Sequence, residues 1–147
     1  MITVEKQIKE KIESFINFPH KATPKNIINI IEQIEKHNIS IEYYKLLYTH
    51  CPVNSITTEV LERAIKSIYY TGILYQKCPD KMTSELIKLA IYYNSSLHDL
   101  FKCCQNKFDK NIVNYIIETK NFEYVFHLLI TYLKHLLDKE VILKIIE

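Results

Sequence analysis

The sequence is poor in glycine and contains no tryptophan. Among 147 residues there is one glycine, Gly72, and there are four prolines. Hairpin turns of the primed types need Gly or Asn-Gly pairs, and the phosphate-binding loops of the Walker A and Rossmann kinds need several glycines. The scarcity of glycine therefore argues against a β-rich fold and against these nucleotide-binding enzyme classes. Helical periodicity runs through the whole chain, so we expect an all-α protein.

Arginine is almost as scarce, because Arg63 is the only copy among nineteen basic residues. Base recognition in nucleic acids favours arginine. The formal charge is only +2, and charges of both signs alternate along the chain without long blocks. These features are typical of a solvated surface and do not favour nucleic-acid binding.

Long hydrophobic runs are also absent. The longest apolar stretch, roughly 124–133, contains a histidine and is too short for a membrane span of about 20 residues. The first eleven residues are charged and have no apolar signal core, so we interpret them as the start of a helix rather than a targeting segment. We expect an intracellular, cytoplasmic protein that does not use a membrane.

The sequence does contain one short motif that occurs five times. In each copy a hydrophobic residue precedes a capping Thr or Asp, and the residue four positions after the cap is again apolar. This pattern is the hydrophobic staple of a helix start, and Thr and Asp are good caps because they accept from free N–H groups of the first turn. The copies are Ala22-Thr23-Pro24, Ile56-Thr57-Thr58, Met82-Thr83-Ser84, Phe108-Asp109-Lys110 and Leu137-Asp138-Lys139.

The five copies of the motif divide the chain into units that start near 22, 56, 82, 108 and 137. Each full unit is predicted to contain two short helices. Such units cannot bury their apolar faces alone, so stacked neighbours make one core, and 1–147 is expected to form a single domain. A helix at 3–17 and the unpaired last helix from 137 would cap its ends. The other predicted helices span about 24–37, 41–50, 57–69, 72–78, 83–93, 96–104, 109–119 and 122–134.

The unit resembles the ankyrin repeat. The Thr23-Pro24 pair and the stretch Leu89-Ala90-Ile91-Tyr92-Tyr93-Asn94 are most similar to it, whereas the middle units are shorter than its usual length of about 33 residues. The resemblance implies a solenoid of stacked antiparallel helix pairs that binds another protein.

Two alternatives stay open. One is a compact bundle of the viral Bcl-2-like kind, which would capture an amphipathic helix in a groove. Its chain length is similar, and the rich Ile, Asn, Lys and Tyr content suits the AT-rich genomes that many large DNA viruses have. The other alternative is a helical repeat that binds RNA or phosphate.

Tyrosine is unusually frequent, with eleven copies. Two doublets fall where the first helix of a unit ends, and adjacent positions of a helix cannot both face one core. We therefore expect one ring of each doublet to be exposed. Exposed tyrosine is enriched at binding hot spots, while packing between units is the alternative role. The predicted partner-binding residues are Tyr69, Tyr70, Tyr92, Tyr93 and Asn94.

The residues that could carry chemistry do not form a recognisable site. Cys51, Cys78 and Cys104 occupy similar places in successive units, but neighbouring helix pairs lie about 8–10 Å apart and zinc ligands must all lie about 2.0–2.3 Å from the ion. His50 and Cys51 point about 100° apart on a helix, which does not suit a Cys/His nucleophile. We expect reduced, buried thiols, no metal or cofactor, and no enzymatic activity.

Two further surfaces follow from the pattern. The apolar residues Val141, Ile142, Ile145 and Ile146 of the unpaired last helix could form a homodimer. A small basic edge at the turns between units could meet an acidic partner or a phosphate, or could simply be solvated. Its five residues are Lys77, Lys81, Lys102, Lys107 and Lys110.

Overall fold

The computed structural model describes residues 2–119 and 122–146, so Met1, Lys120, Asn121 and Glu147 lie outside the described part. This part contains ten α-helices and no strand, which confirms the all-α class, and each helix begins and ends within two residues of its predicted bounds. The helices are α1 (Val4–Asn17), α2 (Pro24–Lys36), α3 (Glu42–His50), α4 (Thr58–Ser67), α5 (Gly72–Lys77), α6 (Ser84–Tyr93), α7 (Leu97–Cys104), α8 (Lys110–Thr119), α9 (Phe122–Leu133) and α10 (Lys139–Ile146).

Capping hydrogen bonds confirm the predicted helix starts. Thr23, Thr57 and Thr83 each accept through Oγ1 from the backbone N–H three residues later, at 3.2, 3.3 and 3.3 Å. Asp109 and Asp138 accept in the same way through Oδ1, both at 2.9 Å. The apolar residues that precede the first four caps are buried, and so are their staple partners. These contacts fix where α2, α4, α6, α8 and α10 begin.

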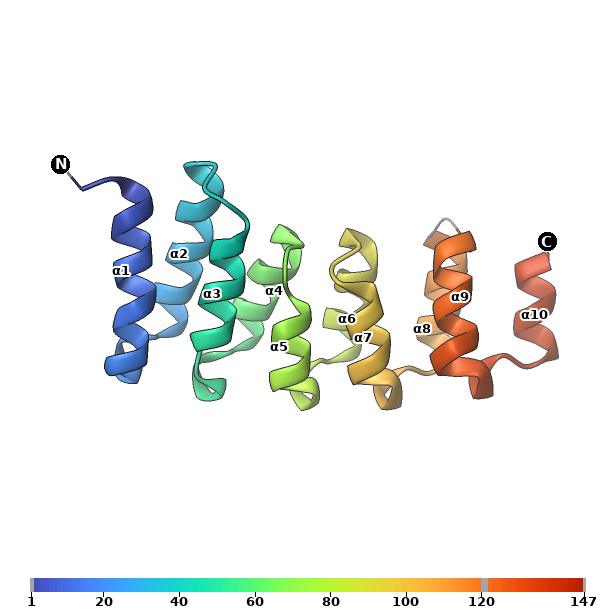
Figure 1. The fold of residues 1–147 in the computed structure, drawn as a ribbon. Helices are drawn as coiled ribbons and strands as arrows, with labels where there is room; N and C mark the ends of the chain where they lie inside the picture. Colours follow the sequence, from blue (N-terminus) through green and yellow to red (C-terminus); the bar gives the residue numbers. More distant parts are fainter. Residues whose placement is uncertain (1, 120–121, 147) are drawn as a thin grey trace.

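The helices form two rows. The even-numbered helices follow one another in one row and the odd-numbered helices in the other, because each helix contacts the next member of its own row. Figure 1 shows an elongated array in which the turns α2–α3, α4–α5 and α6–α7 lie along its upper edge. We call residues 37–41, 68–71 and 94–96 the turn edge. The opposite edge, called the 3₁₀ edge, carries the short segments Pro19–Lys21, Val53–Ser55, Pro79–Lys81, Gln105–Lys107 and Lys134–Leu136.

The apolar core lies between the two rows. The residue four positions after the cap is fully buried in the even-numbered helices α2, α4, α6 and α8. In α10 the corresponding Ile142 is 43% exposed, and Leu143 and Ile146 are exposed beside it. The homodimer that the sequence predicts through this helix stays a prediction. None of the helices in the described part of the chain is both long and apolar enough to cross a membrane.

Candidate protein-interaction surface

The five predicted partner-binding residues lie at the turn edge. Tyr69 and Tyr70 belong to the α4–α5 turn, Tyr92 and Tyr93 end α6, and Asn94 caps it. The first ring of each doublet is the more exposed, at 43% for Tyr69 and 62% for Tyr92, whereas Tyr70 and Tyr93 are half-buried. This confirms the expectation that one ring of each doublet is exposed. Their role in binding stays a prediction.

Tyr69 has an aromatic support beneath it. Its ring stacks on Tyr44 of α3, with centroids 6.0 Å apart and planes at 20°. Tyr44 is itself buried and stacks on Tyr48, with centroids 6.1 Å apart. Stacking of this kind adds to the energy of apolar burial. Tyr69 is therefore held in a fixed place while nearly half of its surface faces outward.

A charged cluster joins the ends of α2 and α4 beside Tyr44. The guanidinium of Arg63 donates to both carboxylate oxygens of Glu35 and, at 2.9 Å, to Oγ of Ser67. The Ser67 hydroxyl donates to Glu35 in turn. The hydrogen bond from Arg63 lowers the pKa of the Glu35 carboxyl. The single arginine of the chain thus holds two neighbouring helix ends together and supports the turn that carries Tyr69.

Tyr70 is held by a hydrogen bond to the preceding odd-numbered helix. Its Oη donates to Oε1 of Glu42 in α3 at 2.5 Å. Tyr43, one unit earlier, donates in the same way to Oε1 of Glu5 in α1 at 2.9 Å. These phenols tie successive members of the odd row together, so Tyr70 has a positioning role within the array.

The backbone of the turn edge is strained. All five non-glycine residues with positive φ in the described part of the chain lie there: Asn38 (50°), Ile68 (65°), Tyr70 (60°), Asn94 (57°) and Ser96 (50°). Asparagine adopts this left-handed conformation readily at helix ends, whereas it costs other L-residues about 1–2 kcal/mol and is most unusual for a β-branched side chain such as that of Ile68. Strain of this kind gathers at functional sites. Its concentration therefore marks the turn edge as the candidate functional surface.

A buried polar network keeps two of the strained turns in place. Thr71 and Ser95 are fully buried, and their hydroxyl oxygens are 2.7 Å apart. The Thr71 hydroxyl also donates to Oγ of Ser96 at 3.0 Å, and Oη of Tyr75 donates to the Ser95 carbonyl at 2.9 Å. Buried, satisfied networks are rigid. The α4–α5 and α6–α7 turns are therefore fixed relative to each other.

The even row also carries half-buried side chains that the sequence-based prediction did not include. Leu89 and Tyr115 are half-buried on α6 and α8, and the Nζ of Lys88 lies 5.9 Å from the ring centroid of Tyr115. A hollow of about 290 Å³ between α4 and α6 also includes Leu89. Leu89 and Tyr115 each lie six positions after the cap of their helix, whereas the residues three, four and seven positions after the cap are buried in α6 and α8. Counting positions from the capping residues would therefore have predicted that Leu89 and Tyr115 face outward.

The predicted basic edge is largely used within the molecule. The Nζ of Lys77 donates to three carbonyls at the end of α3, at 2.7–2.8 Å, and that of Lys81 to two carbonyls around the next 3₁₀ segment, at 2.5 and 2.9 Å. Lys107 donates to the carbonyl of Asp80 at 3.5 Å. The carbonyls at helix ends need such donors. The expectation of a solvated edge is therefore wrong for Lys77 and Lys81, which are half-buried and hold backbone carbonyls of residues 48–56. Lys102, Lys107 and Lys110 are exposed, as a solvated edge requires.

The thiols are in the state that the sequence predicts. All four cysteines are free, and Cys51, Cys78 and Cys104 are buried. Burial raises the pKa of Cys51 and of Cys104 to about 12. The reactive form of cysteine is the thiolate, so these side chains pack as small apolar groups. Within the described residues, no group of three His, Cys, Asp or Glu side chains could hold a metal ion.

Comparisons with protein-family models, with curated proteins and with solved structures find no match for this chain. The function of the turn edge must therefore be inferred from its geometry.

Proposed function

We propose that this chain is an ankyrin-like helical-repeat module that binds another protein through its turn edge and has no enzymatic activity. The observation that carries this proposal is the exposed rings of Tyr69 and Tyr92 on a strained but rigidly supported edge. Tyrosine supplies a large contact area at a low cost in side-chain entropy. A ring that is already fixed before binding loses even less freedom on binding.

The arrangement of the helices supports a repeat architecture. In a repeat array each unit contacts only its neighbours, and the main contacts here join α2 to α4 and α4 to α6 in one row and α5 to α7 in the other. A Bcl-2-like bundle would instead gather helices that are distant in the chain around one compact core. The two rows of Figure 1 favour the repeat.

The basic edge gives little support to the RNA- or phosphate-binding alternative. Lys77, Lys81 and Lys107 donate to backbone carbonyls, and Lys110 forms an ion pair with Asp138 at 2.5 Å. Phosphate binding would have to compete with these contacts. A protein partner at the turn edge would meet the rings of Tyr69 and Tyr92, which are 43% and 62% exposed.

Site-specific photo-crosslinking tests the proposal. The photoreactive amino acid p-benzoyl-phenylalanine replaces Tyr69 or Tyr92, which preserves an aromatic ring, and it replaces the exposed Gln105 of the 3₁₀ edge as a control. Each protein is irradiated in an extract of cells that naturally contain it. We expect one discrete crosslinked protein from positions 69 and 92 and none from 105. The same product from 105, or no product from 69 and 92, would contradict a partner site on the turn edge.

A further inference from the structure

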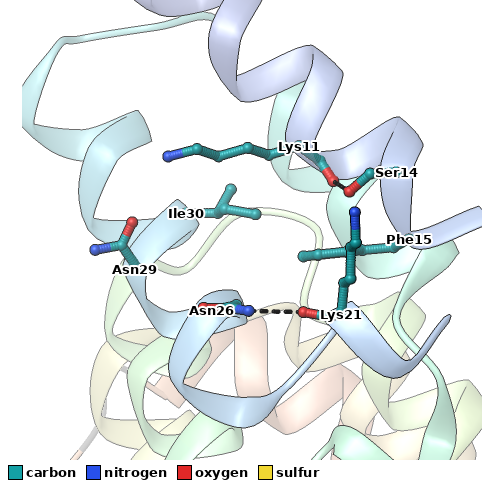
Figure 2. A pocket seen from close by; sticks show the side chains of 7 residues that line it. All are labelled: Lys11, Ser14, Phe15, Lys21, Asn26, Asn29 and Ile30. Atoms are coloured by element: carbon teal, nitrogen blue, oxygen red, sulfur yellow. Dashed lines mark hydrogen bonds between the residues drawn. The ribbon is translucent and has the colours of Figure 1, made fainter. Parts of the chain in front are cut away.

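The two ends of the array differ in the character of their surfaces. Figure 1 shows α1 and α2 at one end and α9 and α10 at the other. Every exposed residue of α1 between positions 5 and 13 is charged or is a glutamine. Figure 2 shows that Lys11, Ser14 and Asn29 lie around the hollow between α1 and α2 at this end. The N-terminal end therefore has the polar outer face that caps a repeat array.

The C-terminal end is apolar instead. In α10 the side chains of Ile142, Leu143 and Ile146 are 43%, 52% and 74% exposed. The residue four positions after the cap, equivalent to Ile142, is fully buried in the other four even-numbered helices. The residue eight positions after the cap, equivalent to Ile146, is fully buried in α2, α4 and α6. These core-type positions are uncovered in α10 because it is the last helix of its row in the described part of the chain.

Leu143 extends the apolar surface beyond these core-type positions. Five positions after the cap, α4, α6 and α8 have the polar residues Glu62, Lys88 and Asn114, and α2 has the half-buried Ile28. A polar residue is thus compatible with the fold at this position, yet α10 exposes a leucine there. Contiguous exposed apolar side chains are typical of interaction sites.

The helix α9 adds Ile130 to the same end. The Oη of Tyr132 lies 3.3 Å from Nε2 of His98 in α7, so this side of α9 faces α7. Ile130 is two positions earlier, about 200° around the helix, and is 44% exposed on the side away from α7. The next place in the odd row, beside α9, holds no helix of the described residues. We call the following four residues the C-terminal end face: Ile130, Ile142, Leu143 and Ile146.

The charge beside this face favours an antiparallel helix as its occupant. Lys139 lies three positions before Ile142 on the same side of α10, is exposed, and forms no ion pair among the described residues. The C-terminal end of a helix attracts a cation. In an antiparallel pair of α10 helices, each Lys139 lies beside the C-terminal end of the other helix. A parallel pair would bring the two ammonium groups together.

We infer that the C-terminal end face binds the same face of a second copy of this chain, with the two α10 helices antiparallel. A two-fold interface must be complementary to itself. An aliphatic face with a lysine at one end and the C-terminal end of the helix at the other meets this condition. None of its residues belongs to the turn edge.

The polar N-terminal end excludes a head-to-tail contact as the main form of association. Such a contact would cover the charged side chains of α1 with an aliphatic surface, and burying charges without partners is costly. The association should therefore stop at two copies. Because α10 has only eight residues and is about 12 Å long, the contact is smaller than a standard interface. We expect a dimer in reversible equilibrium with the monomer.

Sedimentation velocity of the whole chain over a wide range of concentration tests this inference. The mass should rise with concentration from that of the monomer to twice that value and no further. Leu143→Glu places in α10 the residue type that α4 has at this position, and it should raise the dissociation constant of the dimer at least tenfold. Ile16→Glu is the matched control, because Ile16 is 53% exposed in α1 at the other end, and it should leave the dimer unchanged.

A second pair of variants tests the direction of the helices. Lys139→Gln should weaken an antiparallel dimer, whereas Lys25→Gln, at an exposed position of α2, should have no effect. Circular dichroism and the urea midpoint first establish that each variant is folded. A parent chain that stays monomeric, masses above the dimer, or an unchanged dimer in Leu143→Glu would overturn the inference. A dimer that is unchanged or tighter in Lys139→Gln would overturn the antiparallel pairing.

Discussion

Tyr48 in α3 and Tyr75 in α5 occupy equivalent positions, because each lies three residues before a buried cysteine. Replacing either tyrosine by phenylalanine removes one buried hydroxyl. Both side chains are fully buried. The Oη of Tyr75 donates to the carbonyl of Ser95 at 2.9 Å and lies 3.2 Å from its Oγ. The Oη of Tyr48 has no hydrogen-bond partner among the described residues. The two substitutions should therefore differ in their effect on stability.

The expected magnitudes follow from these contacts. A satisfied hydrogen bond contributes about 0.5–1.5 kcal/mol, and a buried polar group without a partner costs about 1–3 kcal/mol. Tyr75→Phe should therefore lower the free energy of unfolding by about 1–2 kcal/mol. Tyr48→Phe should leave it unchanged or raise it by about 1 kcal/mol. In a chain of this size, 1 kcal/mol moves the thermal midpoint by about 2–4 °C.

Urea unfolding followed by circular dichroism at 222 nm measures both variants against the parent chain. The slope of each transition is compared first, because a changed slope means that the array no longer unfolds as one unit. A loss of stability in Tyr48→Phe as large as that in Tyr75→Phe would refute the reasoning, since it would mean that the Tyr48 hydroxyl has a partner in the folded chain.

Three further predictions concern the turn edge and the helix ends near it. Because the φ of Ile68 is 65°, Ile68→Gly should be about 1 kcal/mol more stable to urea unfolding than Ile68→Ala. At Lys66, which is inside the helix, the glycine variant should be the less stable of the two. A higher stability of Ile68→Ala than of Ile68→Gly would refute this. Gly72→Ala should destabilise the chain, because a Cβ there would lie 2.1 Å from Oδ2 of Asp99, and Asp99→Ala should restore part of the loss; additive effects in a thermal melt would speak against that contact. Because its arginine partner lowers the pKa of Glu35 in the folded chain, the stability that this carboxylate adds is present above about pH 4.3 and is lost as the pH falls further. The parent chain should thus lose more stability between about pH 5 and pH 3 than Glu35→Gln does, and parallel pH curves would contradict this assignment.

The helix positions could be predicted because their signals are local. A capping residue and its staple partner are only four positions apart, and this spacing was sufficient to place the starts of α2, α4, α6, α8 and α10. The same register shows which positions of a helix face outward. Leu89 and Tyr115 could have been added to the candidate surface by counting from the caps at Thr83 and Asp109.

The contacts that support the candidate site could not be predicted in the same way. Glu35 and Arg63 are 28 positions apart, and Lys77 reaches carbonyls 26–29 positions earlier. Contacts between residues this far apart depend on how the helices pack against one another, which a single sequence does not show. For this reason only the structure shows which tyrosine of each doublet is exposed. It is also the structure that shows the lysines of the basic edge bonded to backbone carbonyls.

The affinity of the crosslinked partner, once identified, tests the role of the turn edge most directly. Isothermal titration compares the parent chain with Tyr69→Ala and Tyr92→Ala, and with Phe18→Ala as a control, since Phe18 is an aromatic residue that is 49% exposed near the opposite edge. Loss of a hot-spot ring costs about 2 kcal/mol or more, so Kd should rise roughly 30-fold for at least one tyrosine variant and stay unchanged for Phe18→Ala. If both tyrosine variants bind with an unchanged Kd, the turn edge is not the surface that this protein uses to bind its partner.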